Sequence, residues 1–470
     1  MQSTDILVIG AGFGGYVAAL RLAQAGKKVI IVEKDPFLGG VCLHKGCIPT
    51  KSLVTISELY HAISHSEHMG IHGEGALNEE GIRAWKDKLI DKLSKGISFL
   101  CTHQNVTIMQ GKGRFTSPTT AVVALSSGED EISFQQAIIA TGSLPREIPG
   151  FSFEHDKIWS SDDAVNLPCI PGHLTIIGGG YIGIELGISF RKLGSQVHVL
   201  EAGNRLLPLV EEDLTLPVID SLNSLGVAST VSAKATSWKE ENGKVIVAVE
   251  GPEGAFTITT DRVLVVVGRV PATKDLGLEL ALVNVDDHGF IAVNDRFSTS
   301  QPHIFAVGDV IGGQMLAHKA RMEGRTVAEV IIDDLTPASL LPIPWVIYSD
   351  PEIASVGISA EKARGKGIEI EVSTFSFSVL GRALTLDQPK GFLKLVSEKH
   401  TGKVIGVHCV GANASEIIGE ATLAVRLGAS VTDLADTIHA HPTMAEALLE
   451  ASEEPAGKPV HSLGKKEQQI

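Results

Sequence analysis

The segment Ile6-Leu-Val-Ile-Gly10-Ala-Gly12-Phe-Gly-Gly15 opens a pattern of strand, glycine turn and helix. Its apolar run predicts a buried strand, the following residues 16–25 predict a helix, and a second strand over 28–32 ends in Glu33. Glycines in such a turn let the backbone approach a pyrophosphate at the helix N-terminus, and the acid binds a ribose hydroxyl. The segment therefore indicates a dinucleotide site, although one glycine turn alone is weak evidence.

A second copy of the pattern occurs later in the chain. Leu174-Thr-Ile-Ile-Gly178-Gly-Gly180-Tyr-Ile-Gly183 leads into a helix, and a strand over 196–200 ends in Glu201. Glu201 follows Gly178 at the same spacing as Glu33 follows Gly10. Two units with the same internal spacing form a repeat, so the chain is predicted to bind two dinucleotides.

The residues after Glu201 favour NAD at the second site. Ala202 and Gly203 follow the acid, so a 2′-phosphate would meet the carboxylate without an adjacent cation. Arg205 is near enough in sequence to keep NADP open. At the first site, a flavin dinucleotide would relay two electrons between NAD and a nearby pair of thiols.

That pair is Cys42 and Cys47, in Leu38-Gly-Gly-Val-Cys42-Leu-His-Lys-Gly-Cys47-Ile-Pro-Thr-Lys51. In a regular helix the second thiol would lie about 7.5 Å further along the axis. A disulfide needs Cα atoms roughly 4.4 to 6.8 Å apart. Pairing therefore requires a bend, which Gly46 and Pro49 would supply.

Three roles for the cysteine pair are open on the residues alone. A structural disulfide would suit a secreted protein, but residues 1–5 lack the basic start of a signal peptide. A zinc site would need more ligands, and Cys101, Cys169 and Cys409 stand far apart. A redox-active pair in a reducing compartment fits the odd number of cysteines best.

Composition bounds the class of protein. The 470 residues suggest three or four domains, and 44% hydrophobic residues with 49 glycines suit an α/β protein with many tight turns. A net charge of −15 argues against nucleic acid and against an anionic membrane surface as partners. No apolar run reaches the roughly 18 residues of a membrane span. A cytoplasmic enzyme is expected.

Further motifs along residues 5 to 460 support a family resemblance. Besides the cysteine segment and the second glycine turn, they are Ala140-Thr-Gly142, Gly268-Arg269, Ala306-Val-Gly-Asp309 and His439-Ala-His441-Pro-Thr443 with Glu446. Together they resemble the pyridine nucleotide-disulfide oxidoreductases. The resemblance implies an α/β fold with two Rossmann-like dinucleotide-binding domains, a central domain and an α+β C-terminal dimerisation domain. The implied boundaries are 1–147 for the first part of the FAD-binding domain, 148–270 for the NAD-binding domain, 271–342 for the central domain with the second part of the FAD site, and 343–470 for the interface domain.

The resemblance also implies an activity. It is that of a flavoprotein with FAD and NAD⁺, which reoxidises the dihydrolipoamide of 2-oxoacid dehydrogenase-type complexes. Cys42 and Cys47 would form a redox-active disulfide, in which Cys42 exchanges with the substrate and Cys47 faces the flavin. The implied partners are a second copy in a homodimer and a lipoylated E2 acyltransferase or H-protein lipoyl domain, and no metal is implied.

Six residues are expected to carry the chemistry by this resemblance: Cys42, Cys47, His441, Glu446, Lys51 and Glu185. His441 matches the base, in the other subunit's active site, and Glu446 would fix its tautomer, although Thr443-Met-Ala-Glu446 also fits a capping box. Lys51 and Glu185 match a pair near flavin N5, with a surface charge pair as the alternative.

Cofactor-binding residues follow from the same motifs. Asp309 would bind the ribityl chain, or else act as a helix N-cap, and Tyr181 would lie where nicotinamide docks, or else simply pack. The full expected set is Gly10, Gly12, Gly15, Glu33, Lys34, Gly40, Val41, Lys51, Gly113, Thr141, Gly142, Asp309, Ala317, Gly178, Gly180, Tyr181, Ile182, Gly183, Glu201 and Gly268.

Two rival functions need a feature that the sequence lacks, and a third leaves residues that are present without a role. A mercuric-ion reductase would need a cysteine pair after Cys409, and a glutathione reductase would need a basic residue beside Glu201. A non-catalytic flavoprotein would need neither the cysteines nor His441. Departures from the family pattern are His44, Lys45, Thr50 and Ala272, and the residues from Gly457 onward are expected to form a loosely held end.

Overall fold

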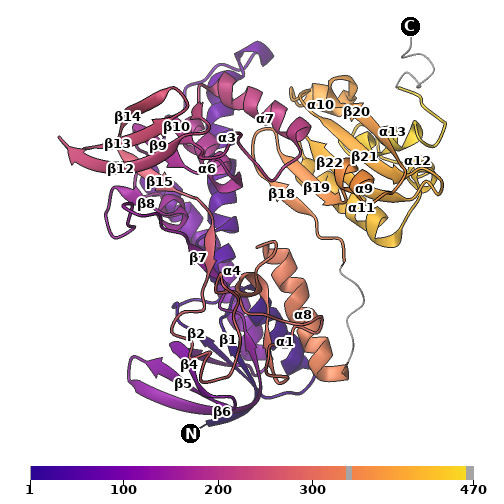
Figure 1. The fold of residues 1–470 in the computed structure, drawn as a ribbon. Helices are drawn as coiled ribbons and strands as arrows, with labels where there is room; N and C mark the ends of the chain where they lie inside the picture. The colour runs from indigo at the N-terminus through magenta and orange to yellow at the C-terminus, as the bar shows by residue number, and fades with distance from the viewer. Residues whose placement is uncertain (1, 335–340, 462–470) are drawn as a thin grey trace. The chain divides into compact units, whose positions relative to one another are not determined.

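The computed structural model describes residues 2–334 and 341–461. Its contacts group the chain into two compact units, each made of two stretches of sequence (Figure 1). The first unit comprises Met1–Ile170 and Leu264–Ser339, and the second comprises Pro171–Val263 and Leu340–Ile470. Residues 462–470, most of the expected loose end, lie outside the described part of the chain.

The first unit is built on a seven-stranded sheet in the order β3-β2-β1-β6-β5-β4, with β17 also paired to β6. Strands β1, β2 and β3 run parallel, and Ile6 to Ile9 pair with Val29 to Val32. Because both faces of the sheet are covered at β1 and β2, these paired residues are apolar throughout. The strands are β1 Gln2–Ile9, β2 Val29–Glu33, β3 Thr107–Gln110, β4 Lys112–Ser117, β5 Thr120–Leu125, β6 Gly128–Ile139 and β17 Ile304–Ala306.

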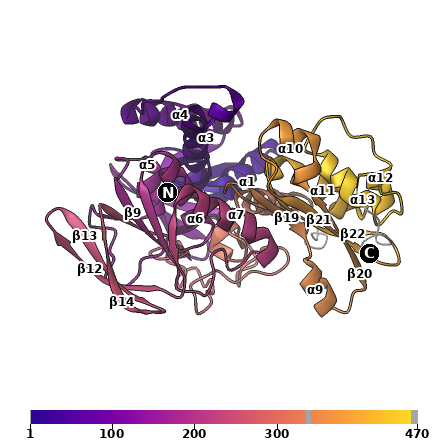
Figure 2. The same cartoon turned by 90° about the horizontal axis from the view of Figure 1, so that it is seen from above.

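Helix α1, Phe13–Gln24, packs closely against α8, Ala317–Asp333. A Cβ on Gly324 would lie 2.1 Å from the Gly14 carbonyl oxygen, so only glycine allows this approach. Helices α3 and α4 lie side by side (Figure 2). The remaining elements of this unit are α2 Gly40–His44, α3 Cys47–His65, η1 Glu67–Met69, α4 Glu79–His103, β7 Ser143–Pro145, β8 Ile158–Trp159, α5 Ser161–Asn166, β16 Arg269–Pro271 and η2 Gly308–Ile311.

The second unit begins with a smaller copy of the same layout. Strands β9, β10 and β11 run parallel, and the antiparallel sheet β12-β13-β14 follows them. Helix α6, Tyr181–Lys192, begins directly after the second glycine turn and has the same length as α1. The other bounds are β9 His173–Ile177, β10 Gln196–Leu200, α7 Glu212–Leu225, β11 Ala228–Thr230, β12 Lys234–Glu241, β13 Lys244–Gly251, β14 Gly254–Thr260 and, at the border between the units, β15 Arg262–Val265.

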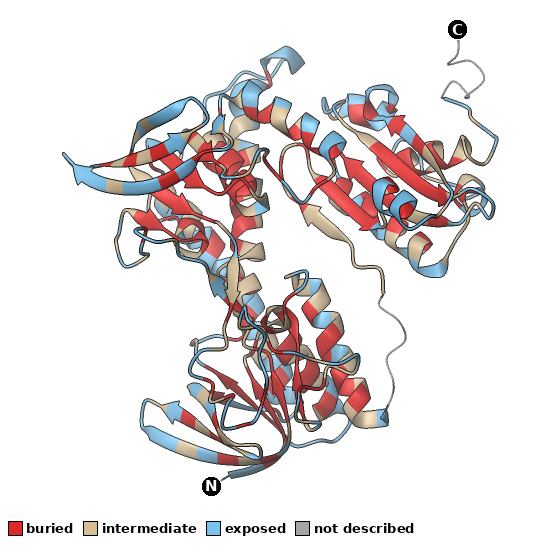
Figure 3. Cartoon of the chain, viewed as in Figure 1, coloured by how far each residue is buried: buried red, intermediate tan, exposed pale blue. Residues whose placement is uncertain are grey.

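The C-terminal part of this unit is an antiparallel sheet in the order β18-β19-β22-β21-β20. Its buried strands pack against α11 and α13 around one apolar core (Figure 3). Its elements are β18 Trp345–Ile347, β19 Ile353–Gly357, α9 Ala360–Gly365, β20 Ile370–Ser376, η3 Phe377–Val379, α10 Gly381–Thr385, β21 Phe392–Glu398, β22 Val404–Val410, α11 Ala414–Leu427, α12 Val431–Ala435 and α13 Glu446–Glu453.

The predicted α/β class is confirmed, with one local correction. The expected bend between the cysteines is present, because α2 ends at His44 and α3 starts at Cys47. Gly46 provides it, with φ −140° and ψ −109°. Pro49 does not, since it lies inside the first turn of α3, where a missing N–H costs nothing. In residues 2–334 and 341–461, no helix combines the length and the apolar character that crossing a membrane requires.

Candidate active site

The first glycine turn joins β1 to α1 in a conformation that larger side chains would disrupt. Gly10 has φ +100°, and a Cβ there would lie 2.4 Å from the Ala140 carbonyl oxygen. A Cβ on Gly15 would lie 2.0 Å from the Gly10 carbonyl oxygen. Glu33 closes the turn, since its carboxylate accepts hydrogen bonds from the Ala11 N–H at 2.7 Å and the Asp35 N–H at 3.0 Å.

The surroundings of this turn fit a flavin dinucleotide. The turn leaves the N-terminus of α1 open without a side-chain cap, which suits a pyrophosphate. The Thr141 hydroxyl is buried without a hydrogen-bond partner, as expected of a group that binds a ligand. Asp309 accepts a hydrogen bond from the Ser143 hydroxyl at 2.5 Å, and Arg269 donates to the same hydroxyl at 2.7 Å. Asp309 lies inside η2, whose N-cap is Val307, so the alternative of an N-cap aspartate is wrong.

The cysteine segment packs directly on this glycine turn. The Gly39 N–H donates to the Ala11 carbonyl at 2.9 Å. Gly40 has φ +63°, and a Cβ there would lie 2.5 Å from the Gly12 Cα. The two glycines before Cys42 therefore hold both thiols beside the first dinucleotide turn.

Within the pair, the two thiols have different electrostatic roles. A hydrogen bond to the Cys47 thiol, together with burial, raises the pKa of Cys42, and the Lys51 charge only partly opposes this. Cys42 therefore keeps its proton in the reduced pair. Cys47 is the first residue of α3, where the helix dipole favours negative charge.

Tyr16 is a neighbour of this pair that sequence analysis missed. Burial is the main cause that raises the pKa of Tyr16 to about 12, so the phenol remains neutral beside Cys42. The residue lies in the first turn of α1, and the pattern gave it no role beyond helix formation.

The second glycine turn repeats the geometry of the first. Gly178 has φ +118°, and a Cβ on Gly183 would lie 2.1 Å from the Gly178 carbonyl oxygen. Glu201 accepts from the Gly179 N–H at 2.7 Å and from the Gly203 N–H at 2.6 Å. Gly179 precedes Glu201 by as many residues as Ala11 precedes Glu33, and Gly203 follows Glu201 as Asp35 follows Glu33. The structural repeat therefore extends to single hydrogen bonds.

Three side chains near the second turn had alternative roles in the sequence analysis. Tyr181, the first residue of α6, is 44% exposed, so part of its ring is accessible at the second turn. Glu185 is only 2% exposed and accepts a 2.8 Å hydrogen bond from the Tyr348 N–H, which excludes a surface charge pair. Arg205 donates to the Pro208 carbonyl at 2.7 Å.

His441 and Glu446 form a hydrogen-bonded pair in the C-terminal part of the second unit. His441 Nδ1 lies 2.9 Å from Glu446 Oε1, and the Thr443 N–H donates to Glu446 Oε2 at 2.8 Å. Burial opposes ionisation, but these hydrogen bonds outweigh it and lower the pKa of Glu446. The carboxylate thus orients the imidazole and accepts from the Thr443 N–H. The capping-box alternative is wrong, because α13 starts at Glu446 itself and its N-cap is Ala445, without a side-chain cap.

The imidazole of His441 is held at one nitrogen and is otherwise accessible. Its side chain is 77% exposed. His439 is more enclosed, with its side chain 4% exposed and Nε2 3.0 Å from Glu420 Oε1. His439 therefore supports the loop, whereas the unbonded ring edge of His441 faces solvent.

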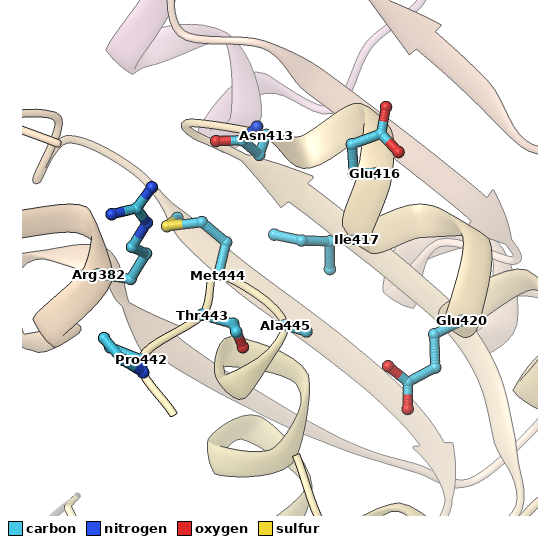
Figure 4. A pocket seen from close by; sticks show the side chains of 9 residues that line it. All are labelled: Arg382, Asn413, Glu416, Ile417, Glu420, Pro442, Thr443, Met444 and Ala445. Atoms are coloured by element: carbon cyan, nitrogen blue, oxygen red, sulfur yellow. The ribbon is translucent and has the colours of Figure 1, made fainter. Parts of the chain in front are cut away.

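A pocket of about 440 Å³ adjoins this loop (Figure 4). Residues from α10, from α11 with its N-cap, and from the loop before α13 line it. They are Arg382, Asn413, Glu416, Ile417, Glu420, Pro442, Thr443, Met444 and Ala445.

The other expected cofactor residues are dispersed around the two turns. Lys34 is exposed just after β2, Val41 lies in α2, Ile182 in α6, and Ala317 begins α8. Gly142 and Gly268 have φ +75° and +114°, and a Cβ on Gly113 would lie 3.1 Å from the Val32 side chain. Within the described ranges, no three histidine, cysteine or carboxylate side chains gather to hold a metal ion.

Comparison with known proteins defines the class. The family model for pyridine nucleotide-disulphide oxidoreductases matches residues 4–324, and the dimerisation domain of that family matches residues 343–452. The chain belongs to this family, and is therefore a homodimeric oxidoreductase that uses FAD and NAD with a redox-active disulfide.

Individual relatives are similar over nearly their whole length. The chain is 40% identical over 467 residues to dihydrolipoyl dehydrogenase 3 of Haloarcula marismortui and 42% identical over 463 residues to dihydrolipoyl dehydrogenase of Geobacillus stearothermophilus, with 98% of each chain covered. Among solved structures, LpdA from Mycobacterium tuberculosis has a TM-score of 0.90 at 25% identity, covering 96% of this chain and 99% of that one.

Proposed function

We propose that this chain is a dihydrolipoyl dehydrogenase, which oxidises dihydrolipoamide and reduces NAD⁺. One observation carries the proposal. The hydrogen bond from the Gly39 N–H to the Ala11 carbonyl holds the segment that contains Cys42 and Cys47 beside the first dinucleotide turn. A thiol pair at that place connects a dithiol substrate to a flavin. The names of the relatives at about 40% identity support the choice of dithiol.

The dithiol half of the reaction is thiol–disulfide exchange. A substrate thiolate attacks Cys42 Sγ, the Cys42–Cys47 bond breaks, and Cys47 leaves as a thiolate stabilised at the start of α3. The second substrate thiol then attacks the other substrate sulfur, which is bound to Cys42. This step closes the lipoyl disulfide and releases Cys42 as a thiol. FAD, when bound at the first turn, would supply the two-electron chemistry that connects the thiol pair to NAD⁺.

A base is required because a substrate thiol with a pKa of about 8.5 is mostly protonated at neutral pH. We assign this role to His441. Glu446 accepts from Nδ1 at 2.9 Å, which leaves Nε2 to take the thiol proton. In the proposed homodimer each His441 serves the thiols of the other subunit, in keeping with its exposure within one chain.

The remaining assignments belong to the cofactor sites. Glu33 and Asp309 would hold FAD, and Lys51 with Glu185 would lie at the flavin edge. Tyr181 would cover the nicotinamide position. Glu201 favours the ribose hydroxyls of NAD over a 2′-phosphate, since its carboxylate stands at the end of β10.

The same proposal includes the domain limits and the partner. We assign 1–147 and 271–342 to FAD binding, 148–270 to NAD binding and 343–470 to the subunit interface. The partner that delivers the dithiol is a lipoylated E2 or H-protein domain. A cytoplasmic location is proposed because a reactive thiol pair requires a reducing compartment.

A single assay tests the proposed function. Purified holoenzyme is mixed with dihydrolipoamide or reduced glutathione, each with NAD⁺ or NADP⁺, and nicotinamide reduction is followed by absorbance. We expect kcat/KM for dihydrolipoamide with NAD⁺ to exceed the other three by at least about a hundredfold. Equal rates with glutathione, or a preference for NADP⁺, would overturn the assignment.

A further inference from the structure

Helix α6 carries two buried charged residues on one face. Glu185 and Lys192 are seven residues apart, which is nearly two turns, so their side chains project from the same side of the helix. Glu185 is 2% exposed and Lys192 is 4% exposed. Buried charges are costly unless each has a fixed partner.

Both partners come from one short segment after β18. The Tyr348 N–H donates to Glu185 Oε1 at 2.8 Å. Two residues later, Asp350 Oδ2 lies 2.5 Å from Lys192 Nζ. Between them, the Ser349 hydroxyl donates to the Pro351 carbonyl at 2.7 Å and fixes the shape of the segment. The segment 348–350 is thus attached to α6 at two points.

The two attachments differ in kind. In the ion pair, the Lys192 side chain is 1% exposed and the Asp350 side chain is 35% exposed. Replacing Lys192 by an uncharged residue therefore does not leave a buried, unpaired carboxylate. The bond to Glu185 is a backbone N–H, whose position depends on where the segment lies. The Lys192–Asp350 ion pair therefore fixes the position of the Tyr348 N–H. The hydrogen bond from that N–H in turn orients the Glu185 carboxylate.

We propose that Lys192 and Asp350 are positioning residues for Glu185 in the nicotinamide and flavin half of the reaction. The inference rests on the proposed function only for the role of Glu185, because the two contacts are features of the fold. Losing the ion pair releases the segment, weakens the Tyr348 bond and lets the carboxylate rotate out of place. The dithiol half-reaction does not involve this face of α6 and keeps its rate.

A purely structural ion pair is the alternative, and the chain offers a matched control. Lys394, whose side chain is 9% exposed, lies 2.7 Å from Asp213 and 3.2 Å from Glu211. Like Lys192, it joins the part of the unit that contains α6 and α7 to the C-terminal sheet. It does not contact the 348–350 segment through these carboxylates.

The experiment compares Lys192→Met with Lys394→Met in the holoenzyme. Hydrogen exchange by mass spectrometry follows the peptide that contains the Tyr348 amide, and stopped flow follows flavin reduction by NADH and, separately, by dihydrolipoamide. For Lys192→Met we expect at least tenfold faster exchange at Tyr348 and about tenfold slower reduction by NADH, with an unchanged rate for dihydrolipoamide. Lys394→Met should change none of the three.

Non-additivity identifies Glu185 as the residue through which the pair acts. Lys192→Met added to Glu185→Gln should slow NADH reduction no further than Glu185→Gln alone. Additive losses, or equal effects of the two lysine variants, would overturn the proposal. If Lys192→Met does not fold, Asp350→Asn gives the same test, and Lys192→Arg should restore normal exchange. A failed dihydrolipoamide assay would reject the proposed substrate but leave the exchange and NADH results decisive for this inference.

Discussion

The two glycine turns have the same backbone and different neighbours. In both, a glutamate at the end of the second strand accepts two backbone N–H bonds, and in both a Cβ on the last glycine would clash with the carbonyl oxygen of the first. The first turn carries the Gly39 and Gly40 contacts that bring the thiols to it. The second carries an exposed Tyr181 and a buried Glu185 instead. We propose that each turn provides a dinucleotide site and that the residues packed around it determine which half of the reaction occurs there.

The largest effect is expected from removing the thiol that distinguishes the first turn. Cys47→Ser should lower NAD⁺ reduction by dihydrolipoamide at least about a thousandfold, because no disulfide can form. The protein should stay yellow and should still pass electrons from NADH to ferricyanide, which bypasses the thiols. Cys169→Ser is the control in the same unit and should retain normal turnover. A Cys47→Ser enzyme with full dihydrolipoamide activity would show that the pair is not on the electron path.

The next largest effects are expected from matched alanine substitutions, which distinguish the functions of the two turns. Gly15→Ala and Gly183→Ala place a Cβ 2.0 Å and 2.1 Å from a carbonyl oxygen at equivalent positions. Gly15→Ala should purify without flavin absorbance. Gly183→Ala should keep its flavin and its dithiol half-reaction but raise the KM for NAD⁺ about tenfold or more.

Gly96→Ala is a suitable control for these variants, since a Cβ there meets nothing within 4 Å in α4. It should behave like the parent enzyme. Loss of flavin from Gly183→Ala, or its retention at full occupancy in Gly15→Ala, would mean that the two sites are assigned in the wrong order.

The same comparison shows what could be predicted from sequence. Periodicity and spacing located both turns, because strand, glycines and acid are contiguous within about 30 residues. The bend between the thiols also followed from geometry, although Pro49 was wrongly included as a cause. These features depend on local chain conformation.

Long-range contacts could not be predicted in this way. Glu185 is oriented by Tyr348, and Lys192 pairs with Asp350, 163 and 158 positions away respectively. No local pattern marks such partners, since burial and pairing are decided by tertiary packing. Tyr16 was missed for a related reason, because Cys42 is distant in sequence and becomes its neighbour only in the folded chain.

The most direct test of the whole account uses hybrid dimers. Cys47→Ser and His441→Gln subunits with different affinity tags are co-expressed, and dimers that contain one of each are isolated by both tags. If each thiol pair works with the histidine of the other subunit, the hybrid has one intact site and should show about half of the parent activity with dihydrolipoamide and NAD⁺. Both parent mutants should be nearly inactive. A hybrid as inactive as the two mutants would contradict the shared site and the assignment of His441 as the base.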